Sequence, residues 1–264
     1  MTMIFSLHHD IDPNGAFEMT DTATNFYAPA AESSREEFHI LRDKLAIPST
    51  DGLVSRRRLN GVLTRSVTQF PATLISGRAG TGKTSLAASF VQGEKGVAWF
   101  TVESTDVDWQ SFSRYFAASM GKMDACASRT ADVTPGKRVL QTDIARFLVS
   151  LFVTPDGEPL PSVIVLDDIH HIFDARWFDD FFQLLLYSLP SESHLLLLCR
   201  SKPPNPLWRL RSKQMLNVLD ERVIAFDTSE TAELFDSIGL SPRMAPEAQQ
   251  KCFGRVSKLL QFAG

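Results

Sequence analysis

The chain has 264 residues, of which 44% are hydrophobic and 22% are charged, and its formal net charge is −4. These proportions are those of an ordinary soluble globular protein with one large core and room for a smaller domain. The net negative charge gives no support to direct DNA binding. No apolar run approaches the ~20 residues needed to cross a membrane. The three cysteines are widely spaced and have no CxxC pair, so we expect a cytoplasmic protein with reduced thiols.

The first third of the chain is uneven in composition. Residues 1–37 are polar, small or acidic without periodicity, which predicts a mobile leader. Apolar residues at helical spacing from Phe38 to Leu45 predict a helix that Pro48 ends. The basic run at 56–58 is of a kind that usually forms a solvated face, although its place ahead of the first strand permits a nucleotide contact.

Residues 77–84 form a complete G-x-x-x-x-G-K-[ST] motif. The apolar run at 72–75 predicts a strand before it, and residues 85–91 predict a helix after it. Glycines allow the backbone to turn so that its N–H groups wrap a phosphate, and the helix N-terminus adds further N–H groups. Lys83 can then reach the β- and γ-phosphates, and Thr84 can offer its hydroxyl to Mg²⁺. The candidate nucleotide-binding residues here are Gly77, Arg78, Ala79, Gly80, Thr81, Gly82, Lys83, Thr84 and Ser85.

The rest of the chain alternates buried strands with amphipathic helices. The predicted strands are 96–101, 163–168, 195–199 and, as a fifth candidate, 215–219. The predicted helices are 112–120, 142–152 and 177–189, with a polar surface loop at 121–137 and a turn at 155–157. Strands without polar alternation indicate a parallel sheet covered on both faces. We therefore expect an α/β P-loop NTPase domain at 38–225, followed by the start of a small helical domain at 226–264.

Charged side chains follow two of these strands. Asp167 ends its strand where open α/β sheets bind ligands, so it can hold Mg²⁺ opposite Thr84. Asp168 either orients or deprotonates the attacking water or only supports its neighbours by hydrogen bonds. Arg200 either reaches the γ-phosphate or is an exposed arginine after a strand. The candidate catalytic residues are thus Lys83, Asp168 and Arg200, and the metal ligands are Thr84 and Asp167.

Other chemically suggestive residues have simpler interpretations. His170 and His171 stand beside the two aspartates, but adjacent residues rarely face one ion, so we expect histidines that pack or form hydrogen bonds. The aromatic residues between Trp177 and Phe182 are interpreted as the buried face of a helix rather than a base-stacking surface.

Several blocks of the sequence, taken in order, resemble one family. The blocks are KLAIP at 44–48, LVSRRRL at 53–59, VAWF at 97–100, VLDDIH at 165–170 and LCR at 198–200. From about Leu41 to the C-terminus, they resemble the nucleotide-binding module of the large ATP-dependent LuxR-type regulators related to the maltose-regulon activator. That family belongs to the STAND class of signal-transducing P-loop ATPases.

The resemblance implies residue roles. Lys83 and Thr84 would be Walker A ligands, Asp167 the Walker B acid and Arg200 the sensor arginine. Arg56 lies in the segment that the family places near the adenosine.

The chain also departs from the family. It has Gly77-Arg78 where the family usually has Ala-Pro, and Gly254-Arg255 where the family has Gly-Trp. The winged-helix, sensor and DNA-binding parts have no counterpart before Gly264. We therefore expect either a truncated regulator or a stand-alone ATPase whose output lies elsewhere.

The leading hypothesis is an ATP-binding switch that uses ATP, ADP and Mg²⁺, hydrolyses ATP slowly and regulates transcription through another domain or a protein partner. Nucleotide-dependent oligomerisation is compatible with it, and specific DNA binding by this chain is not expected. The alternatives are a nucleotide-dependent binding module without useful turnover and, less favoured, a P-loop kinase with Asp168 as its base. A kinase also needs a lid and an acceptor pocket, for which the sequence has no signature.

Overall fold

The computed structural model describes residues 39–94, 96–122, 138–153 and 159–263. The predicted leader at 1–37, the turn at 155–157 and all but the first two residues of the predicted loop at 121–137 lie outside this part. The chain from Ile40 onward forms one compact unit.

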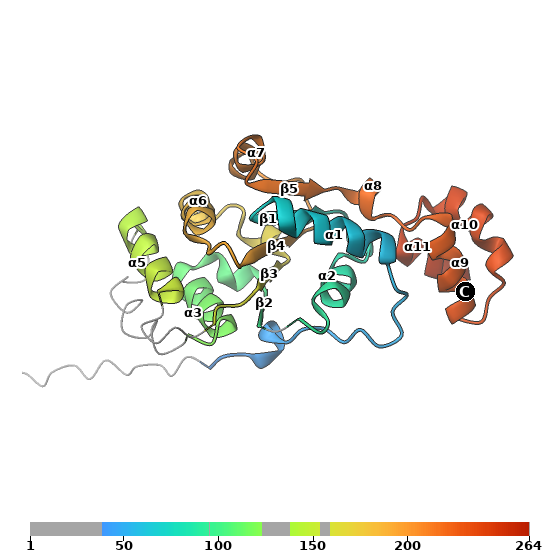
Figure 1. Ribbon diagram of the computed structural model, residues 1–264, viewed down its shortest axis with the longest axis horizontal. Helices are drawn as coiled ribbons and strands as arrows, with labels where there is room; N and C mark the ends of the chain where they lie inside the picture. Colours follow the sequence, from blue (N-terminus) through green and yellow to red (C-terminus); the bar gives the residue numbers. More distant parts are fainter. Residues whose placement is uncertain (1–38, 95, 123–137, 154–158, 264) are drawn as a thin grey trace, which may run out of the picture. The chain divides into compact units, whose positions relative to one another are not determined.

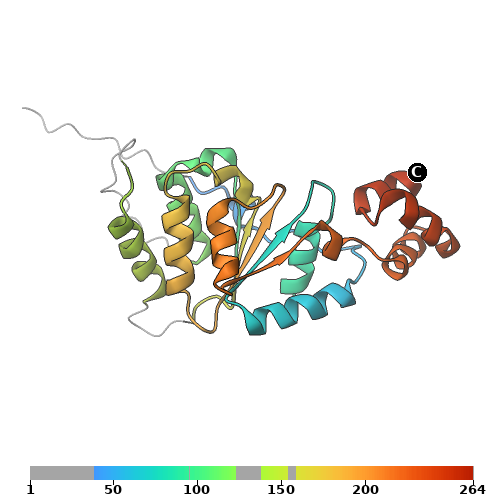
Figure 2. The same cartoon turned by 90° about the horizontal axis from the view of Figure 1, so that it is seen from above.

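The centre of this unit is a five-stranded sheet in which every pair of neighbouring strands is parallel (Figure 2). Its order is β2-β3-β4-β1-β5. The strands are β1 (Ala72–Ser76), β2 (Val97–Thr101), β3 (Val163–Asp167), β4 (His194–Cys199) and β5 (Leu216–Leu219). Every residue of β3 and β4 is buried, as a central parallel sheet covered on both faces requires. The predicted α/β P-loop NTPase fold is confirmed.

Helices cover both faces of the sheet (Figures 1 and 2). Leu59 and Leu63 of α1 (Arg57–Gln69) and Leu86 of α2 (Lys83–Val91) pack on one face. The other face carries α3 (Trp109–Ser119), α6 (Phe178–Ser188) and α7 (Asn205–Ser212), with α5 (Gln141–Phe152) against α6. The predicted core aromatics at 177, 178, 181 and 182 are all buried. The rings of Trp177 and Phe181 pack on Trp109 and Phe112 of α3.

A second, smaller core lies after the sheet. The short helix α8 (Glu221–Ile224) leads into α9 (Thr228–Ser237), α10 (Ala245–Cys252) and α11 (Val256–Ala263). Buried Phe226, Phe235 and Leu259 join these three helices. The described residues also form short 3-10 turns: η1 (Arg42–Leu45), η2 (Ser104–Val107), η4 (Ile169–Ile172) and η5 (Pro242–Met244). None of the helices in the described ranges is long and apolar enough to span a bilayer.

The helix predicted from Phe38 to Leu45 is wrong, because the described part of that segment forms only the 3-10 turn η1. Leu41, one of its apolar residues, is 58% exposed. The turn is instead anchored by Lys44, whose buried ammonium lies 2.6 Å from the carboxylate of Asp106. A buried ion pair, rather than an apolar stripe, therefore fixes this segment.

Three helices in the described ranges were not predicted, the shortest being α8. The basic and apolar residues at 53–63 run into α1, which continues to Gln69. The second, α7, follows two prolines and contains Pro206 in its first turn. A proline is tolerated there because the first-turn N–H groups have no partner within the helix.

The strand order determines which side chains meet. Because all the strands are parallel, their carboxyl ends lie along one edge of the sheet, where open α/β folds bind ligands. Strand β4 lies between β1 and β3. The residues that follow Ser76, Leu166 and Cys199 therefore converge, although they are far apart in the sequence.

Candidate functional site

The glycine-rich loop connects β1 to α2. Gly80 and Gly82 have φ values of +73° and +82°, which side chains rarely adopt, so glycine is required at both positions. Gly82 is the N-cap of α2 and leaves the first N–H groups of that helix unpaired by any side chain. The loop thus gathers backbone donors and the positive end of a nine-residue helix at the carboxyl edge of the sheet.

Lys83 begins α2 and is the cation of the loop. Its side chain is 6% exposed, and its ammonium donates to the carbonyl oxygen of Arg78 over 3.1 Å. Burial lowers the pKa of Lys83, against the opposing effect of the carboxylates of Asp168 and Asp167. No ion pair of Lys83 occurs within the described residues. A buried ammonium whose partner is a neutral carbonyl is a strong site for an anionic ligand.

Thr84 and Asp167 meet across the gap between α2 and β3. The Thr84 hydroxyl donates to Oδ2 of Asp167 over 2.8 Å, and the other carboxylate oxygen accepts the N–H of Asp168. Burial raises the pKa of Asp167, while the Thr84 hydrogen bond lowers it. A hydroxyl and a carboxylate are the hard oxygen donors that Mg²⁺ prefers, so these residues fit that metal.

Asp168 forms an ion pair with Arg200, the residue after β4. The Nε and Nη2 atoms of Arg200 lie 3.0 Å and 2.5 Å from the two oxygens of Asp168. Asp168 has a φ of +55°, so the backbone leaves the extended conformation of β3 at this residue. Nδ1 of His170 is 3.7 Å from the same carboxylate, and its ring packs on that of His171.

The outer side of the loop is held by residues from distant segments. Arg78 donates from its backbone N–H and its guanidinium to Glu221 of α8, with a shortest distance of 2.7 Å. Arg255 donates to the carbonyl of Ala79, and the N–H of Ser257 donates to the carbonyl of Gly80. These contacts attach the loop to α8 and to the beginning of α11.

Arg56 is not on a solvated face, so that interpretation is wrong for this member of the basic run. It is 5% exposed, and its Nη2 donates to the carbonyls of Ile224 and Ala225 and to the carboxylate of Glu230. The guanidinium also lies over the ring of Phe226, 3.8 Å from its centroid. Arg56 therefore joins the segment before α1 to the beginning of the C-terminal helices.

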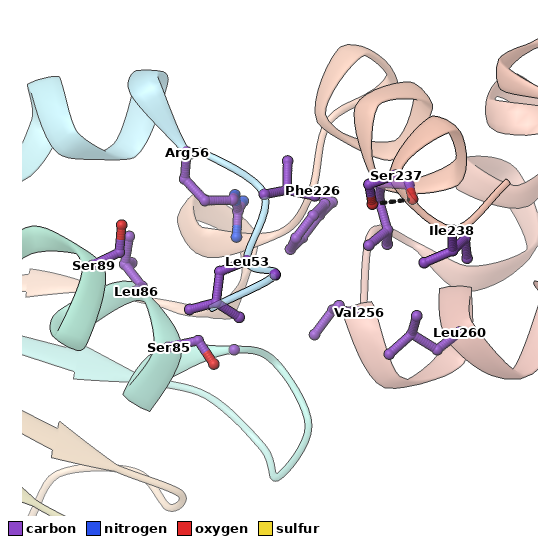
Figure 3. A pocket seen from close by; sticks show the side chains of 14 residues that line it. Leu53, Arg56, Ser85, Leu86, Ser89, Phe226, Ser237, Ile238, Val256 and Leu260 are labelled. Atoms are coloured by element: carbon purple, nitrogen blue, oxygen red, sulfur yellow. Dashed lines mark hydrogen bonds between the residues drawn. The ribbon is translucent and has the colours of Figure 1, made fainter. Parts of the chain in front are cut away.

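A largely apolar cavity of about 210 Å³ adjoins both Arg56 and the first two turns of α2 (Figure 3). Figure 3 shows α2 on one side of it and the C-terminal helices on the other. Mostly apolar side chains with a few serine hydroxyls are typical of a site for an aromatic ring system. The lining residues are Gly52, Leu53, Val54, Arg56, Gly82, Ser85, Leu86, Ser89, Phe226, Leu234, Ser237, Ile238, Val256 and Leu260.

The candidate residues from the sequence thus converge at one edge of the sheet. Thr84 contacts Asp167, Arg200 contacts Asp168, and Ser85 and Arg56 line the cavity. Sequence reasoning missed Glu221, Arg255, Ser257 and Phe226. No local motif marks these four residues, because their roles arise only when the C-terminal helices pack near the loop.

The parallel sheet, its strand order and the loop between β1 and α2 define a P-loop NTPase. A model of the AAA ATPase domain family matches residues 55–198, which is more than half of the chain. The chain belongs to this family of ATPase domains.

The fold is shared with a solved structure of a signalling ATPase. A signal-transduction ATPase with numerous domains and a tetratricopeptide-repeat sensor, from Pyrococcus horikoshii, is 16% identical with a TM-score of 0.52. The match covers 83% of this chain but 31% of that protein, so this chain spans about a third of its length. A Walker-type ATPase of Pyrococcus abyssi is 13% identical with a TM-score of 0.48, over 80% of this chain and 67% of the other.

Proposed function

We propose that this chain is a nucleotide-dependent switch that binds ATP or ADP with Mg²⁺ and hydrolyses ATP slowly. The observation that carries the proposal is the burial of Lys83 without an ion-pair partner in the described part of the chain. An ammonium loses much hydration energy on burial, and a phosphate would compensate for that loss. Membership in the AAA ATPase domain family supports a nucleoside phosphate as the ligand.

Each part of the site has a role in this proposal. The loop from Gly77 to Gly82 and the first N–H groups of α2 surround the phosphates, and Lys83 neutralises their charge. Mg²⁺, when bound, would be held by Thr84 and Asp167 and would neutralise further phosphate charge. The cavity beside Arg56 accepts the base, with apolar side chains against the ring faces.

Hydrolysis would follow the general course of phosphoryl transfer. A water molecule attacks the γ-phosphorus, and the bond from that phosphorus to the β–γ bridging oxygen breaks. Asp168 orients the water and accepts its proton, while the guanidinium of Arg200 stabilises the charge on the γ-phosphoryl oxygens.

We further propose a role in signal transduction. The sequence blocks that resemble the STAND class and its LuxR-type regulators support it, and so does the fold shared with a STAND protein. In this proposal, residues 38–225 are the ATPase domain, and residues 226–264 begin a lid that moves with the nucleotide state. Regulation of transcription would then act through another domain or a protein partner, which also makes any specific contact with DNA.

Lys83→Ala tests nucleotide binding. It removes a charge-assisted hydrogen bond to phosphate, so the dissociation constant of a fluorescent ATP analogue is expected to rise by about 10- to 100-fold. Lys213→Ala removes an exposed lysine just before β5, at the edge of the sheet opposite the loop, and serves as the matched control. Equal affinities of the two variants, with melting temperatures near that of the parent, would contradict the role of Lys83.

A nucleotide-dependent binding module without useful turnover is the second candidate. It is favoured by the ion pair that ties Asp168, the proposed base, to Arg200. Single-turnover hydrolysis separates the two candidates. A switch that hydrolyses ATP shows a measurable rate that Asp168→Asn slows without loss of Mg-ATP binding. A parent protein that binds ATP and releases no phosphate is a binding module.

A further inference from the structure

The segment between η1 and α1 contributes to the wall of the proposed base cavity. None of residues 45–55, which we call the strap, is buried. Within the described part of the chain, the hydrogen bonds of the strap join only its own members. Gly52, Leu53 and Val54 nevertheless line the cavity, and Figure 3 shows Leu53 between α2 and the C-terminal helices. Val54 packs on the C-terminal core, whereas Leu53 is 40% exposed. The place of Leu53 therefore depends on what holds the strap at its two ends.

A buried cation holds each end of the strap. Lys44 and Arg56 are both 5% exposed. Arg56 is attached to the C-terminal helices, as described above. The ammonium of Lys44 lies 2.6 Å from the carboxylate of Asp106, 3.4 Å from that of Glu103 and 4.1 Å from the ring centroid of Tyr115. In Figure 1 the strap (blue) runs from beside β2, past α2, to the beginning of α1. It is thus tied to the sheet side at one end and to the C-terminal helices at the other.

The acceptor of Lys44 is itself held in place. Asp106 is fully buried, and its carboxylate accepts the N–H of Glu103 and the hydroxyl of Ser111, both over 2.8 Å. A carboxylate fixed by η2 and α3 offers a rigid attachment point for the strap. Lys44 does not line the cavity. Any effect of Lys44 on a bound base must therefore pass through the strap.

We infer that Lys44 is a positioning residue for the base of the nucleotide. Its ion pair with Asp106 holds the strap, and the strap keeps Leu53 in place in the wall of the cavity. The inference rests on the proposed function, in which this cavity accepts the base. The phosphates bind at the loop between β1 and α2, so Lys44 acts on the base and leaves the binding of the phosphates unchanged.

The size of the effect follows from the ordering of the strap. When one end is free, the wall must be ordered again as the base binds, and each side chain that becomes immobilised lowers affinity by roughly 2- to 10-fold. Leu53 and the adjacent wall residues thus account for about a tenfold loss of affinity, which corresponds to about 1.4 kcal/mol. A ligand without a base does not use the wall and should lose no affinity.

Two ligands, one with a base and one without, test the inference. Mg-ADP carries the nucleoside, and Mg-pyrophosphate carries only the two phosphates. Displacement of a fluorescent ATP analogue gives both dissociation constants at one ionic strength. The ratio of the pyrophosphate constant to the ADP constant measures the contribution of the nucleoside. Partial unfolding changes both constants alike and leaves this ratio unchanged.

Three variants separate anchoring from a loss of stability. Lys44→Ala removes the anchor and leaves Asp106 without its buried cation. Adding Asp106→Asn removes the remaining charge, so stability should recover in part while the strap stays free. Ile144→Ala removes a buried side chain of α5, which packs on α6, and serves as the matched destabilised control.

The three variants have different expected results. Lys44→Ala should lower the ratio by about tenfold through weaker binding of ADP, with the affinity for pyrophosphate unchanged. The double variant should keep the low ratio, and Ile144→Ala should keep the ratio of the parent. An unchanged ratio in Lys44→Ala, an equal fall in Ile144→Ala, or recovery of the ratio on adding Asp106→Asn would each overturn the inference.

The parent protein separates a failure of the proposed function from a failure of this inference. If the folded parent bound neither ligand, the proposed function would fail, and the role of Lys44 would fail with it. If the parent bound pyrophosphate as tightly as ADP, phosphate binding would stand. The role of the cavity in binding the base, and with it the role of Lys44, would then be contradicted.

Discussion

Replacing Arg56 with alanine should strongly destabilise the protein. Arg56 and Glu230 form an ion pair at 2.9 Å with side chains only 6% and 7% exposed. The substitution leaves this buried carboxylate with only the more exposed Arg58, 3.0 Å away, as its cationic partner. It also removes the hydrogen bonds to Ile224 and Ala225 and the cation–π contact with Phe226. Breaking a buried pair in this way costs about 3–5 kcal/mol. For a unit of this size, that is a fall of roughly 6–20 °C in melting temperature.

Thermal and urea unfolding measure this loss. Arg57→Ala is the matched control, because Arg57 is the exposed next residue of the same basic run, and its replacement should change stability by less than about 0.5 kcal/mol. Adding Glu230→Gln to Arg56→Ala should cost less than the sum of the two single changes, because the buried charge that has lost its buried partner disappears. Equal stability of the Arg56→Ala and Arg57→Ala variants would refute the assignment of Arg56 as a buried link.

Two further predictions concern the loop and the sheet. Gly80→Ala should lower the free energy of urea unfolding by about 1–3 kcal/mol, because the φ of Gly80 is +73° and a Cβ there would lie 2.5 Å from Oγ of Ser257. The control is Gly61→Ala on α1, where a Cβ has room and the change should be neutral or stabilising. Equal effects of the two substitutions would contradict the close packing of Ser257 on the loop. Burial lowers the pKa of His194 from 6.5 to about 4, against the effect of its hydrogen bond with the carbonyl of Phe70. As the pH is lowered, the imidazole of His194 is therefore protonated in the unfolded chain before it is protonated in the folded protein. The free energy of unfolding should then fall by about 3 kcal/mol between pH 6.5 and pH 4. His194→Gln should remove this part of the pH dependence, and an unchanged profile would show that His194 does not cause it.

Much of the sheet and its ligand edge can be predicted from the sequence, because both depend on local patterns. Continuous apolar runs such as 163–166 favour buried parallel strands, and the motif at 77–84 needs a strand before it and a helix after it. Once the strands are parallel, Asp167 and the residue after Cys199 must lie at the same edge as the loop. The contact between Thr84 and Asp167 follows from that rule.

Long-range polar contacts could not be predicted. Lys44 stands in a segment with helix-like spacing, yet its ion pair with Asp106, 62 residues away, determines how the segment packs. Arg56 looks like one member of a solvated run until Glu230 is placed beside it. The same is true of Glu221, which holds the loop through Arg78, 143 residues earlier in the chain. Charged residues have no periodicity that reveals such partners.

The buried ammonium of Lys83 is the group that we propose binds the phosphates of a nucleotide. Calorimetric titration of the parent protein with Mg-ADP, and then with a non-hydrolysable ATP analogue and Mg²⁺, tests it most directly. We expect saturable binding of both ligands at a single site, and binding to the Lys83→Ala variant that is weaker by about 10- to 100-fold. Absence of heat and of any rise in melting temperature when the folded parent is mixed with either nucleotide at millimolar concentration would contradict it.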